Sequence, residues 1–378
     1  MLYSDTGGGH RAAARALTFA LMAQSTPCST GMCDPLIGQG RPLVRRLTSL
    51  YPTIIKRARP AWAAIYHGSN SRPAFAALRA SFGPQVRGVL LQTIAEADPD
   101  VVLSVHPLLN HVAWTAMQRS GRPRGLMTVV TDLVQLHRGW AFPPADVVVV
   151  PTEEAQRYVT RARVAARKVR LLGFPVDMRF RPPQLGEQAA MRKELGLDPG
   201  RPTVVVMGGG EGSGRMSEQI GALARRDRPW QVIAVCGRNE RLRRRLAARS
   251  FPTPVLVLGF VDTMPNLLRA TDLVVTKAGP GAIAESLATG LPVILTGYLP
   301  GQETPNVDYV TQHGVGLYAP HAGQLLRAVQ ELLGGDQAQL QEMARRAREI
   351  TRPHAALDIA GECLRLAGSY MTASPALL

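Results

Sequence analysis

The stretch from residue 271 to residue 306 constrains the fold of this chain most strongly. Residues 273–276 are a short β-branched run, Gly279-Pro280-Gly281 form a tight turn, and residues 282–288 are strong helix formers that stop at Gly290. This order predicts strand, glycine turn and helix. The first N–H groups of such a helix have no partner within it and favour a phosphate group. Any α/β protein needs glycines at such turns, so a purely structural role stays open.

Two further glycine clusters make the functional interpretation stronger. Gly208, Gly209, Gly210 and Gly212 follow an apolar run, and a third cluster, residues 7–9, precedes His10 near the start of the chain. Three glycine clusters at strand ends predict a binding site lined by backbone amides. Glu285 then lies one turn into the helix that begins near Gly279, within reach of a sugar hydroxyl on the same ligand.

The length and the alternation of apolar runs predict two domains. A chain of 378 residues exceeds what one hydrophobic core usually serves. We expect a first domain at 1–180, a second at 181–350 after the linker Arg181-Pro182-Pro183, and a closing helix at 351–378 that crosses back to the first domain. Each half is predicted to be an α/β doubly wound parallel sheet, with the ligand cleft between the halves.

Short β-branched runs give the expected strands, and helices are expected between them. In the first half a helix at 86–97 follows an irregular, proline-rich stretch, and only residues 1–3 represent a first strand, which is either stunted or starts upstream. The expected strands are 101–105, 126–130, 147–150 and 169–172 in the first half, and 204–207, 232–236, 255–258, 273–276 and 293–295 in the second.

Polar and aromatic residues follow the expected strands of the first half. His106 comes after strand 101–105, and Asp132 comes after strand 126–130. The loop that follows carries His137, Arg138 and Trp140. Parallel sheets place their ligands at the carboxyl ends of their strands. We therefore expect these side chains at a site, where Trp140 either covers the core or holds an acyl chain or glycerol backbone.

The charge of the chain points to an anionic counterpart. Forty-four Lys and Arg against 28 Asp and Glu give a formal charge of +16. Basic stretches at 161–170, 241–249 and 345–352 lack the interleaved aromatic residues of a nucleic-acid platform, so nucleic acid is not expected as a partner. Half of this charge is expected on solvated helix faces, and the rest is assigned to an anionic membrane lipid surface.

Cations and apolar residues alternate between Arg41 and Arg59. That mixture is typical of an amphipathic surface at a membrane interface, and equally of a helical pair packed on its own domain. No window approaches the roughly 18 uninterrupted apolar residues of a membrane span. The sequence therefore predicts peripheral association with a membrane.

The sequence carries no recognisable metal or cofactor signature. The four cysteines have no metal-ligand spacing, and Asp98-Pro99-Asp100 is interpreted as a turn between a helix and a strand. The sequence holds no phosphate-binding loop of ATPases and no complete dinucleotide fingerprint. Nucleotide-sugar transfer is the function class that these observations favour, and no cofactor is expected.

Taken together, five motifs resemble the monogalactosyldiacylglycerol synthases, which are GT-B glycosyltransferases related to the enzyme that completes lipid II. The similarity runs from Ser4 to about Thr351. The motifs are Ser4 to Ala12, Ser104 to Pro107, Thr131 to Leu133 with His137, Arg138 and Trp140, Lys277 to Gly281 with Glu285, and Pro300 to Asn306.

The resemblance implies inverting, metal-independent transfer of galactose from UDP-galactose to 1,2-diacylglycerol at the cytoplasmic face of a membrane. A UDP-glucose donor and a lipid II type N-acetylglucosaminyl transfer stay open as alternatives. So does a membrane-associated binding protein that kept the fold and lost catalysis. Asp177 occupies the position where the lipid II enzyme has an arginine near the nucleotide, so that contact is not carried over.

The resemblance also implies roles for individual residues. His10 is the preferred base for the acceptor hydroxyl, with a pKa near neutrality, and Asp132 is the alternative. The acceptor and membrane residues are Gly8, Gly9, His106, His137, Arg138 and Trp140. The donor-binding residues are Gly208, Gly209, Gly210, Gly212, Phe260, Val261, Lys277, Gly279, Gly281, Glu285, Gln302, Glu303 and Asn306.

Overall fold

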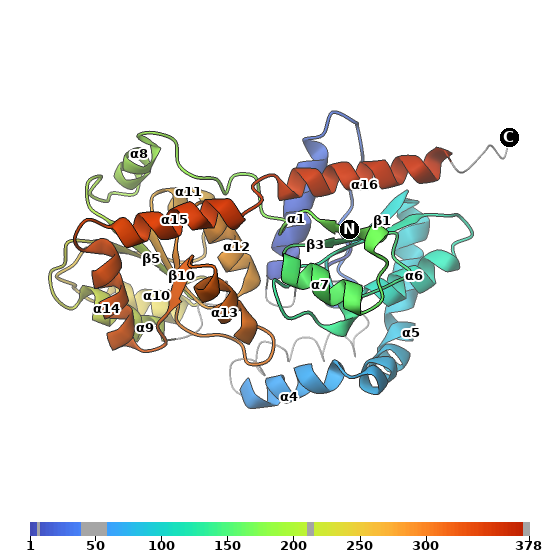
Figure 1. Ribbon diagram of the computed structural model, residues 1–378, viewed down its shortest axis with the longest axis horizontal. Coiled ribbons are helices and arrows are strands. Elements are labelled where there is room, and N and C mark those ends of the chain that lie inside the picture. The colour runs from blue at the N-terminus through green and yellow to red at the C-terminus, as the bar shows by residue number, and fades with distance from the viewer. Residues whose placement is uncertain (6–7, 39–58, 210–214, 373–378) are drawn as a thin grey trace. The chain divides into compact units, whose positions relative to one another are not determined.

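A computed structural model describes residues 1–5, 8–38, 59–209 and 215–372 of the chain (Figure 1). The chain divides into two compact units. Unit 1 comprises Met1–Met178, Pro300–Gln302 and His354–Leu378, and unit 2 comprises Arg179–Leu299 and Glu303–Pro353. The predicted donor residues Gly210 and Gly212, and most of the predicted interfacial stretch from Arg41 to Arg59, lie outside the described residues.

Unit 1 is built on a parallel sheet of valine-rich strands. The order is β1-β2-β3-β4, from β1 (Val101–Ser104), β2 (Gly125–Val129), β3 (Val147–Val150) and β4 (Val169–Leu171). Leu2 adds single parallel bridges to Ser104 on one side and to Cys33 on the other. Leu2 therefore lies between Cys33, which follows it on one side, and β1, which comes later in the chain on the other side. This reversal makes the boundary between Leu2 and β1 a topological switch point.

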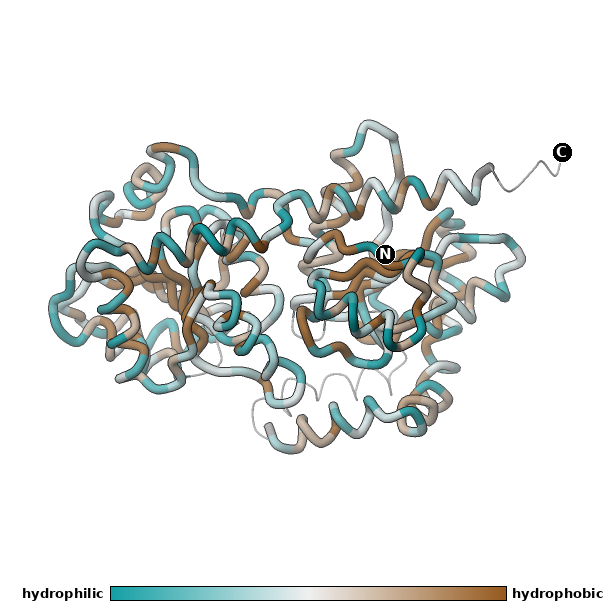
Figure 2. The backbone as a smooth tube through the Cα atoms, viewed as in Figure 1, coloured by the Kyte–Doolittle hydropathy of each residue, from teal (hydrophilic) through white to brown (hydrophobic). Residues whose placement is uncertain are grey.

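Helices cover both faces of this sheet. Side chains alternate along a strand, so Val148 and Val150 pack with α5, α6 and α7, whereas Val147 and Val149 pack with α1 and α16. Figure 1 shows α16 beside α1, and Figure 2 shows the hydrophobic strands between the helical layers. The helices of unit 1 are α1 (Gly9–Met22), α4 (Arg59–Ser69), α5 (Arg72–Ala97), α6 (Asn110–Gln118), α7 (Glu153–Arg161) and α16 (Ala355–Thr372), with the short turns η1 (Arg138–Trp140) and η2 (Ala166–Lys168).

Two predicted helix boundaries were wrong. Helix α5 begins at Arg72 rather than at residue 86, and it continues through Pro84. A proline inside a helix removes one backbone hydrogen bond, but Phe75 and Leu90, on either side of Pro84, are both buried, so packing holds the two halves together. The sequence also predicts a helix from Glu153 to Ala165, whereas helix α7 ends at Arg161.

Unit 2 is a second parallel sheet, of order β10-β9-β8-β5-β6-β7. The chain starts in the middle at β5, runs outward through β6 and β7, and returns to the other side of β5 with β8. The switch point therefore lies between β5 and β8. The sixth strand, β10, was not predicted, because Gly316-Leu317-Tyr318 begins with glycine and has no β-branched residue. The strands are β5 (Thr203–Met207), β6 (Gln231–Val235), β7 (Val255–Leu258), β8 (Leu273–Thr276), β9 (Val293–Leu295) and β10 (Gly316–Tyr318).

The helices of unit 2 follow the expected alternation with the strands. The sequence predicts helical structure from Ala322 to Ala367, and the structure divides this segment into three helices with breaks near Gly334 and Pro353. In unit 2 these are α14 (Ala322–Leu333) and α15 (Ala338–Ile350), after α8 (Glu187–Glu194), α9 (Met216–Ala224), α10 (Glu240–Ala247), α11 (Met264–Arg269), α12 (Pro280–Ala288) and α13 (Thr304–Gln312).

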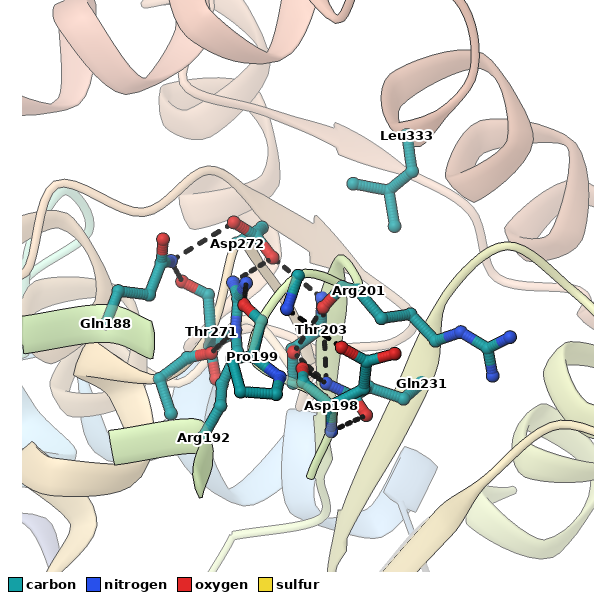
Figure 3. Close-up of polar contacts among 12 residues, drawn as sticks. Gln188, Arg192, Asp198, Pro199, Arg201, Thr203, Gln231, Thr271, Asp272 and Leu333 are labelled. Carbon is teal, nitrogen blue, oxygen red and sulfur yellow. Dashed lines mark hydrogen bonds and ion pairs between the residues drawn. The ribbon is translucent and has the colours of Figure 1, made fainter. Parts of the chain in front are cut away.

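A polar network joins α8 to the amino ends of β5 and β8 (Figure 3). The carboxylate of Asp272 accepts hydrogen bonds from Arg192 at 2.6 Å, from the backbone N–H of Thr203 at 2.7 Å and from Gln188 at 3.1 Å. Arg192 is only 5% exposed and also donates to the carbonyl of Ala270. The network stabilises the edge of the sheet opposite to the one that carries the glycine clusters.

We expect Arg192→Met to lower the free energy of unfolding of unit 2 by about 3 kcal/mol, because it leaves a partly buried carboxylate without its cation. The matched control is Arg345→Met, which removes an exposed ion pair to Glu342 on α15 and should cost less than about 1 kcal/mol. Urea unfolding of both variants checks the difference. Equal losses would show that the network contributes no more than a surface pair.

Candidate active site

His10 lies at the switch point of unit 1, in the first turn of α1. Gly8 precedes the helix with a φ of +85°, a left-handed conformation that favours glycine. The imidazole Nδ1 of His10 is 2.9 Å from the hydroxyl of Thr131, which follows β2. Its ring also makes an edge contact with the ring of His106, at 4.7 Å between centroids. The residues that follow β1 and β2 therefore meet the first turn of α1.

Three histidines of this site are held neutral. Burial lowers the pKa of His10 to about 4, although a hydrogen bond to the carbonyl of Val105 partly opposes the shift. Burial also lowers the pKa of His106, helped by His10 and His137, and it lowers that of His137 to about 4, helped by Arg138. The pKa of His10 is thus below the near-neutral value expected from the sequence, and its ring is uncharged at pH 7.

Asp132 is a buried carboxylate held by two N–H donors. The indole Nε1 of Trp140 donates to one oxygen at 2.6 Å, and the side-chain amide of Gln302, which belongs to the same unit, donates to the other at 3.4 Å. Trp140 itself is fully buried. Of the two roles that the sequence left open for Trp140, its burial favours the packing role, and its indole N–H also orients Asp132.

The turn that carries Trp140 is fixed from two sides. Arg138 donates its backbone N–H and its Nε to Asn70, at 2.6 and 2.8 Å. The buried amide of Asn110 donates to the carbonyl of Gly139 at 2.8 Å. A methyl group on Gly139 would lie 2.5 Å from the carbonyl oxygen of Pro107, so only glycine fits there. The turn is a rigid support for the Asp132 contact.

A pocket of about 440 Å³ lies beside this turn in unit 1. Arginines line part of it, and the guanidinium of Arg79 stacks over the ring of Phe75 at 5.4 Å. The remaining lining is mostly aromatic and apolar, so the pocket offers cations next to apolar rings. Its lining includes Arg72, Phe75, Arg79, Trp114, Arg138 and Phe142.

The switch point of unit 2 brings together two of the predicted donor loops. Gly208 and Gly209 follow β5, and Lys277 follows β8. Gly209 has a φ of +73°, and a methyl group on it would lie 3.9 Å from Nζ of Lys277. A cation is therefore placed against the backbone of the glycine loop, where an anion can contact both.

Helix α12 starts beside this loop, at Pro280 after Gly279. Among the described residues no side chain caps its first turn, and nothing lies within 4 Å of a methyl group built on Gly281. The N–H groups of the first turn thus face space in which an anion can bind. Glu285 lies further along α12 and is half-buried.

Glu303 and Asn306 shape the loop before α12. One oxygen of the Glu303 carboxylate accepts the N–H of Leu299 at 2.6 Å, and the other would lie 3.6 Å from a methyl group on Gly279. Asn306 is 3% exposed and donates to the carbonyl of Ala278 at 2.8 Å. The structure places both residues at this loop, and the buried Asn306 supports the loop backbone.

Phe260 follows β7 and is 55% exposed, although it is a large apolar residue. The guanidinium of Arg238, which follows β6, stacks on its ring at 5.3 Å. Val261 is half-buried beside it. An exposed aromatic ring of this kind is suited to stacking on a base, which is consistent with the donor-binding role that the family resemblance implies for Phe260.

Sequence reasoning missed several residues of these sites. Thr131, Asn110 and Arg238 are each placed by tertiary contacts, although Thr131 and Arg238 also stand just after a strand, which is a signal that could have found them. Over the described ranges, no three His, Cys, Asp or Glu side chains gather as a metal site would require. No helix of the same ranges is long and apolar enough to cross a bilayer.

We expect the thermal stability of the protein to fall between pH 6.5 and pH 4. The folded protein holds His10 and His137 neutral down to about pH 4, whereas in the unfolded chain they ionise near pH 6.5. In that window the unfolded state binds more protons, so acid favours unfolding. His137→Asn retains an oxygen that can accept the N–H of Gly139 and removes one of these groups. Its melting temperature should fall less between pH 7.5 and pH 5 than that of the wild type; parallel slopes would contradict the assignment.

Comparisons with known proteins find matches for both units of the chain. The family model of monogalactosyldiacylglycerol (MGDG) synthase matches residues 10–176, and that of the glycosyltransferase family 28 C-terminal domain matches residues 203–358. A probable monogalactosyldiacylglycerol synthase, chloroplastic, of Glycine max is 32% identical over 374 residues, which cover 95% of this chain and 69% of the relative. Monogalactosyldiacylglycerol synthase 1, chloroplastic, of Arabidopsis thaliana is 31% identical over 369 residues, with the same coverage.

A solved structure shows the fold. The crystal structure of MurG from Acinetobacter baumannii has a TM-score of 0.61 to this chain at 14% identity, and the match covers 97% of this chain and 98% of the other. The expected GT-B fold is thereby confirmed, as is the resemblance drawn from the five motifs. The chain belongs to the monogalactosyldiacylglycerol synthase family and is a UDP-sugar glycosyltransferase.

Proposed function

We propose that this enzyme transfers galactose from UDP-galactose to the free hydroxyl of 1,2-diacylglycerol, with inversion at the anomeric carbon. Relatives named monogalactosyldiacylglycerol synthase support the substrates, because their similarity covers nearly the whole chain. The observation that carries the donor half is the position of Lys277 against the Gly209 loop, next to the start of α12. UDP-sugar binds to unit 2, and diacylglycerol binds to unit 1.

The leaving group is stabilised by groups that are already in place. As the bond between C1 of galactose and the phosphate oxygen breaks, the electron pair and the negative charge pass to UDP. Lys277 and the N–H groups of the first turn of α12 stabilise that charge without any reorganisation of water. Phe260 stacks on the uracil, and Glu285 binds the ribose hydroxyls. This arrangement supports transfer that needs neither a metal ion nor another cofactor.

The acceptor hydroxyl loses its proton to His10. A neutral imidazole has a lone pair, and burial keeps His10 in that form at physiological pH. The oxygen of diacylglycerol attacks C1 of galactose while its proton moves to the ring. Asp132, held by Trp140, is the second candidate for the base. His10 is preferred because its ring lies in the first turn of α1 at the switch point of unit 1.

We propose further that the protein works at the cytoplasmic face of a membrane, as a peripheral protein on anionic lipid. The pocket of unit 1 combines arginines with aromatic rings, which suits a molecule with a polar head and apolar chains. Ile65 on α4 is 49% exposed, and the chain has a formal charge of +16. Cations and exposed apolar side chains together favour an anionic bilayer surface.

Product identification tests this function directly. The protein is incubated with vesicles of diacylglycerol and an anionic phospholipid, and separately with labelled UDP-galactose, UDP-glucose or UDP-N-acetylglucosamine. We expect a lipid product with a β-linked galactose from UDP-galactose alone, and the same rate in the presence of EDTA. A glucolipid product, transfer only to a lipid II precursor, or activity that EDTA abolishes and Mg²⁺ restores would each overturn the corresponding part of the proposal.

The role of Lys277 has its own test. We expect Lys277→Met to lower kcat/KM for UDP-galactose by about 10²- to 10³-fold, the usual loss when one stabilising group of a developing anion is removed. Lys193→Met removes an exposed lysine from α8 of the same unit and serves as the control. Steady-state kinetics on the same vesicles compare the two. Similar activity in both variants would exclude Lys277 from the diphosphate site.

A further inference from the structure

The contact between Thr131 and His10 joins two elements that are far apart in the sequence. Thr131 follows β2 and is 3% exposed, and its hydroxyl oxygen is 2.9 Å from Nδ1 of His10. That distance is a normal one for a hydrogen bond between a hydroxyl and a ring nitrogen. The threonine therefore contacts the proposed base directly, on the nitrogen nearer to the main chain.

The two ring nitrogens of a neutral imidazole cannot play the same role. One carries hydrogen and the other has the lone pair, and the partner of one nitrogen decides the state of the other. For His10 to take a proton through Nε2, hydrogen must reside on Nδ1. A hydroxyl oxygen can accept that hydrogen. The carbonyl of Val105 also accepts a hydrogen bond from the ring, so Nε2 stays available only where Thr131 and Val105 share the hydrogen on Nδ1.

The surroundings of His10 favour a dipolar partner over a charged one. The ring of His106, from the loop after β1, contacts the His10 ring, and His106 also interacts with His137; burial keeps both neutral. Asp132 follows Thr131 but is held by Trp140, and Arg11 on α1 pairs with Asp5. When the His10 ring becomes an imidazolium during transfer, the Thr131 oxygen is therefore a fixed dipole against its N–H.

We propose that Thr131 is a positioning residue for the transfer reaction. Its hydroxyl oxygen accepts the Nδ1–H of His10, orients the ring and leaves the Nε2 lone pair for the acceptor hydroxyl. During the step the hydroxyl proton passes to Nε2, the acceptor oxygen bonds to C1 of galactose, and UDP departs with the electron pair. This inference rests on the proposed function of His10 as the base.

Two substitutions at Thr131 separate the hydroxyl from the shape of the side chain. We expect Thr131→Val to lower kcat by about 10- to 100-fold, the loss seen when a partner that orients a functional histidine is removed. Its affinity for UDP should be unchanged, because UDP binds to unit 2. Thr131→Ser retains the hydroxyl and should restore most of the turnover. The matched control is Thr271→Val, which removes a buried threonine hydroxyl bonded to Leu267 at the opposite edge of the unit 2 sheet and should keep wild-type kcat.

A second measurement reports the tautomer of the His10 ring directly. In protein labelled with ¹⁵N-histidine, the His10 signals are assigned by their loss in His10→Ala, and the ¹⁵N shifts show which nitrogen carries hydrogen. We expect Nδ1–H in the wild type and in Thr131→Ser, and a mixture in Thr131→Val. Wild-type kcat in Thr131→Val, or Nε2–H in the wild-type protein, would overturn the inference. If the wild type forms no galactolipid, the proposed function fails, whereas the tautomer still tests the contact with Thr131.

Discussion

Parallel pairing of the strands is the constraint on which the rest of this structure depends. In both units every ladder described is parallel, so all carboxyl ends of one sheet lie on the same edge. Each sheet also reverses its winding once, and at that point two neighbouring loops turn away in opposite directions. His10 meets Thr131 beside one such point, and Lys277 meets Gly209 at the other. Backbone topology therefore brings the functional residues of each unit to one edge of its sheet.

The two units use dipoles where many enzymes use full charges. In unit 1, burial makes a charged imidazole costly, so His10, His106 and His137 are neutral and interact through ring contacts and hydrogen bonds. In unit 2, helix α12 presents uncapped N–H groups within the described chain, with Lys277 as the nearby cation. Fixed dipoles in a site shielded from water stabilise charge as it develops, and they need no reorganisation.

Two sets of arginines look alike in the sequence but differ in the structure. Arg243 and Arg244 on α10 pair with Glu240, and Arg345 and Arg346 on α15 pair with Glu342. Such pairs are solvated and contribute little to stability. Arg72, Arg79 and Arg138 stand apart in the sequence but line one pocket together with aromatic rings. A run of arginines in the sequence is therefore a weaker sign of a binding site than arginines that the fold brings together.

The sequence by itself determined the strands β1 to β9, the glycine turns, the position of His10 and Asp132 after strand ends, and the family, because these depend on local residue pattern. It did not determine how α5 passes through Pro84, the strand β10, or the low pKa of His10, since each depends on packing and burial. The partners of the functional groups were likewise decided only by tertiary structure. Thr131 reaches His10 because separate loops meet at one sheet edge, whereas Trp140 reaches Asp132 because the loop between β2 and β3 folds back on itself. Neither contact leaves a periodic signal in the chain.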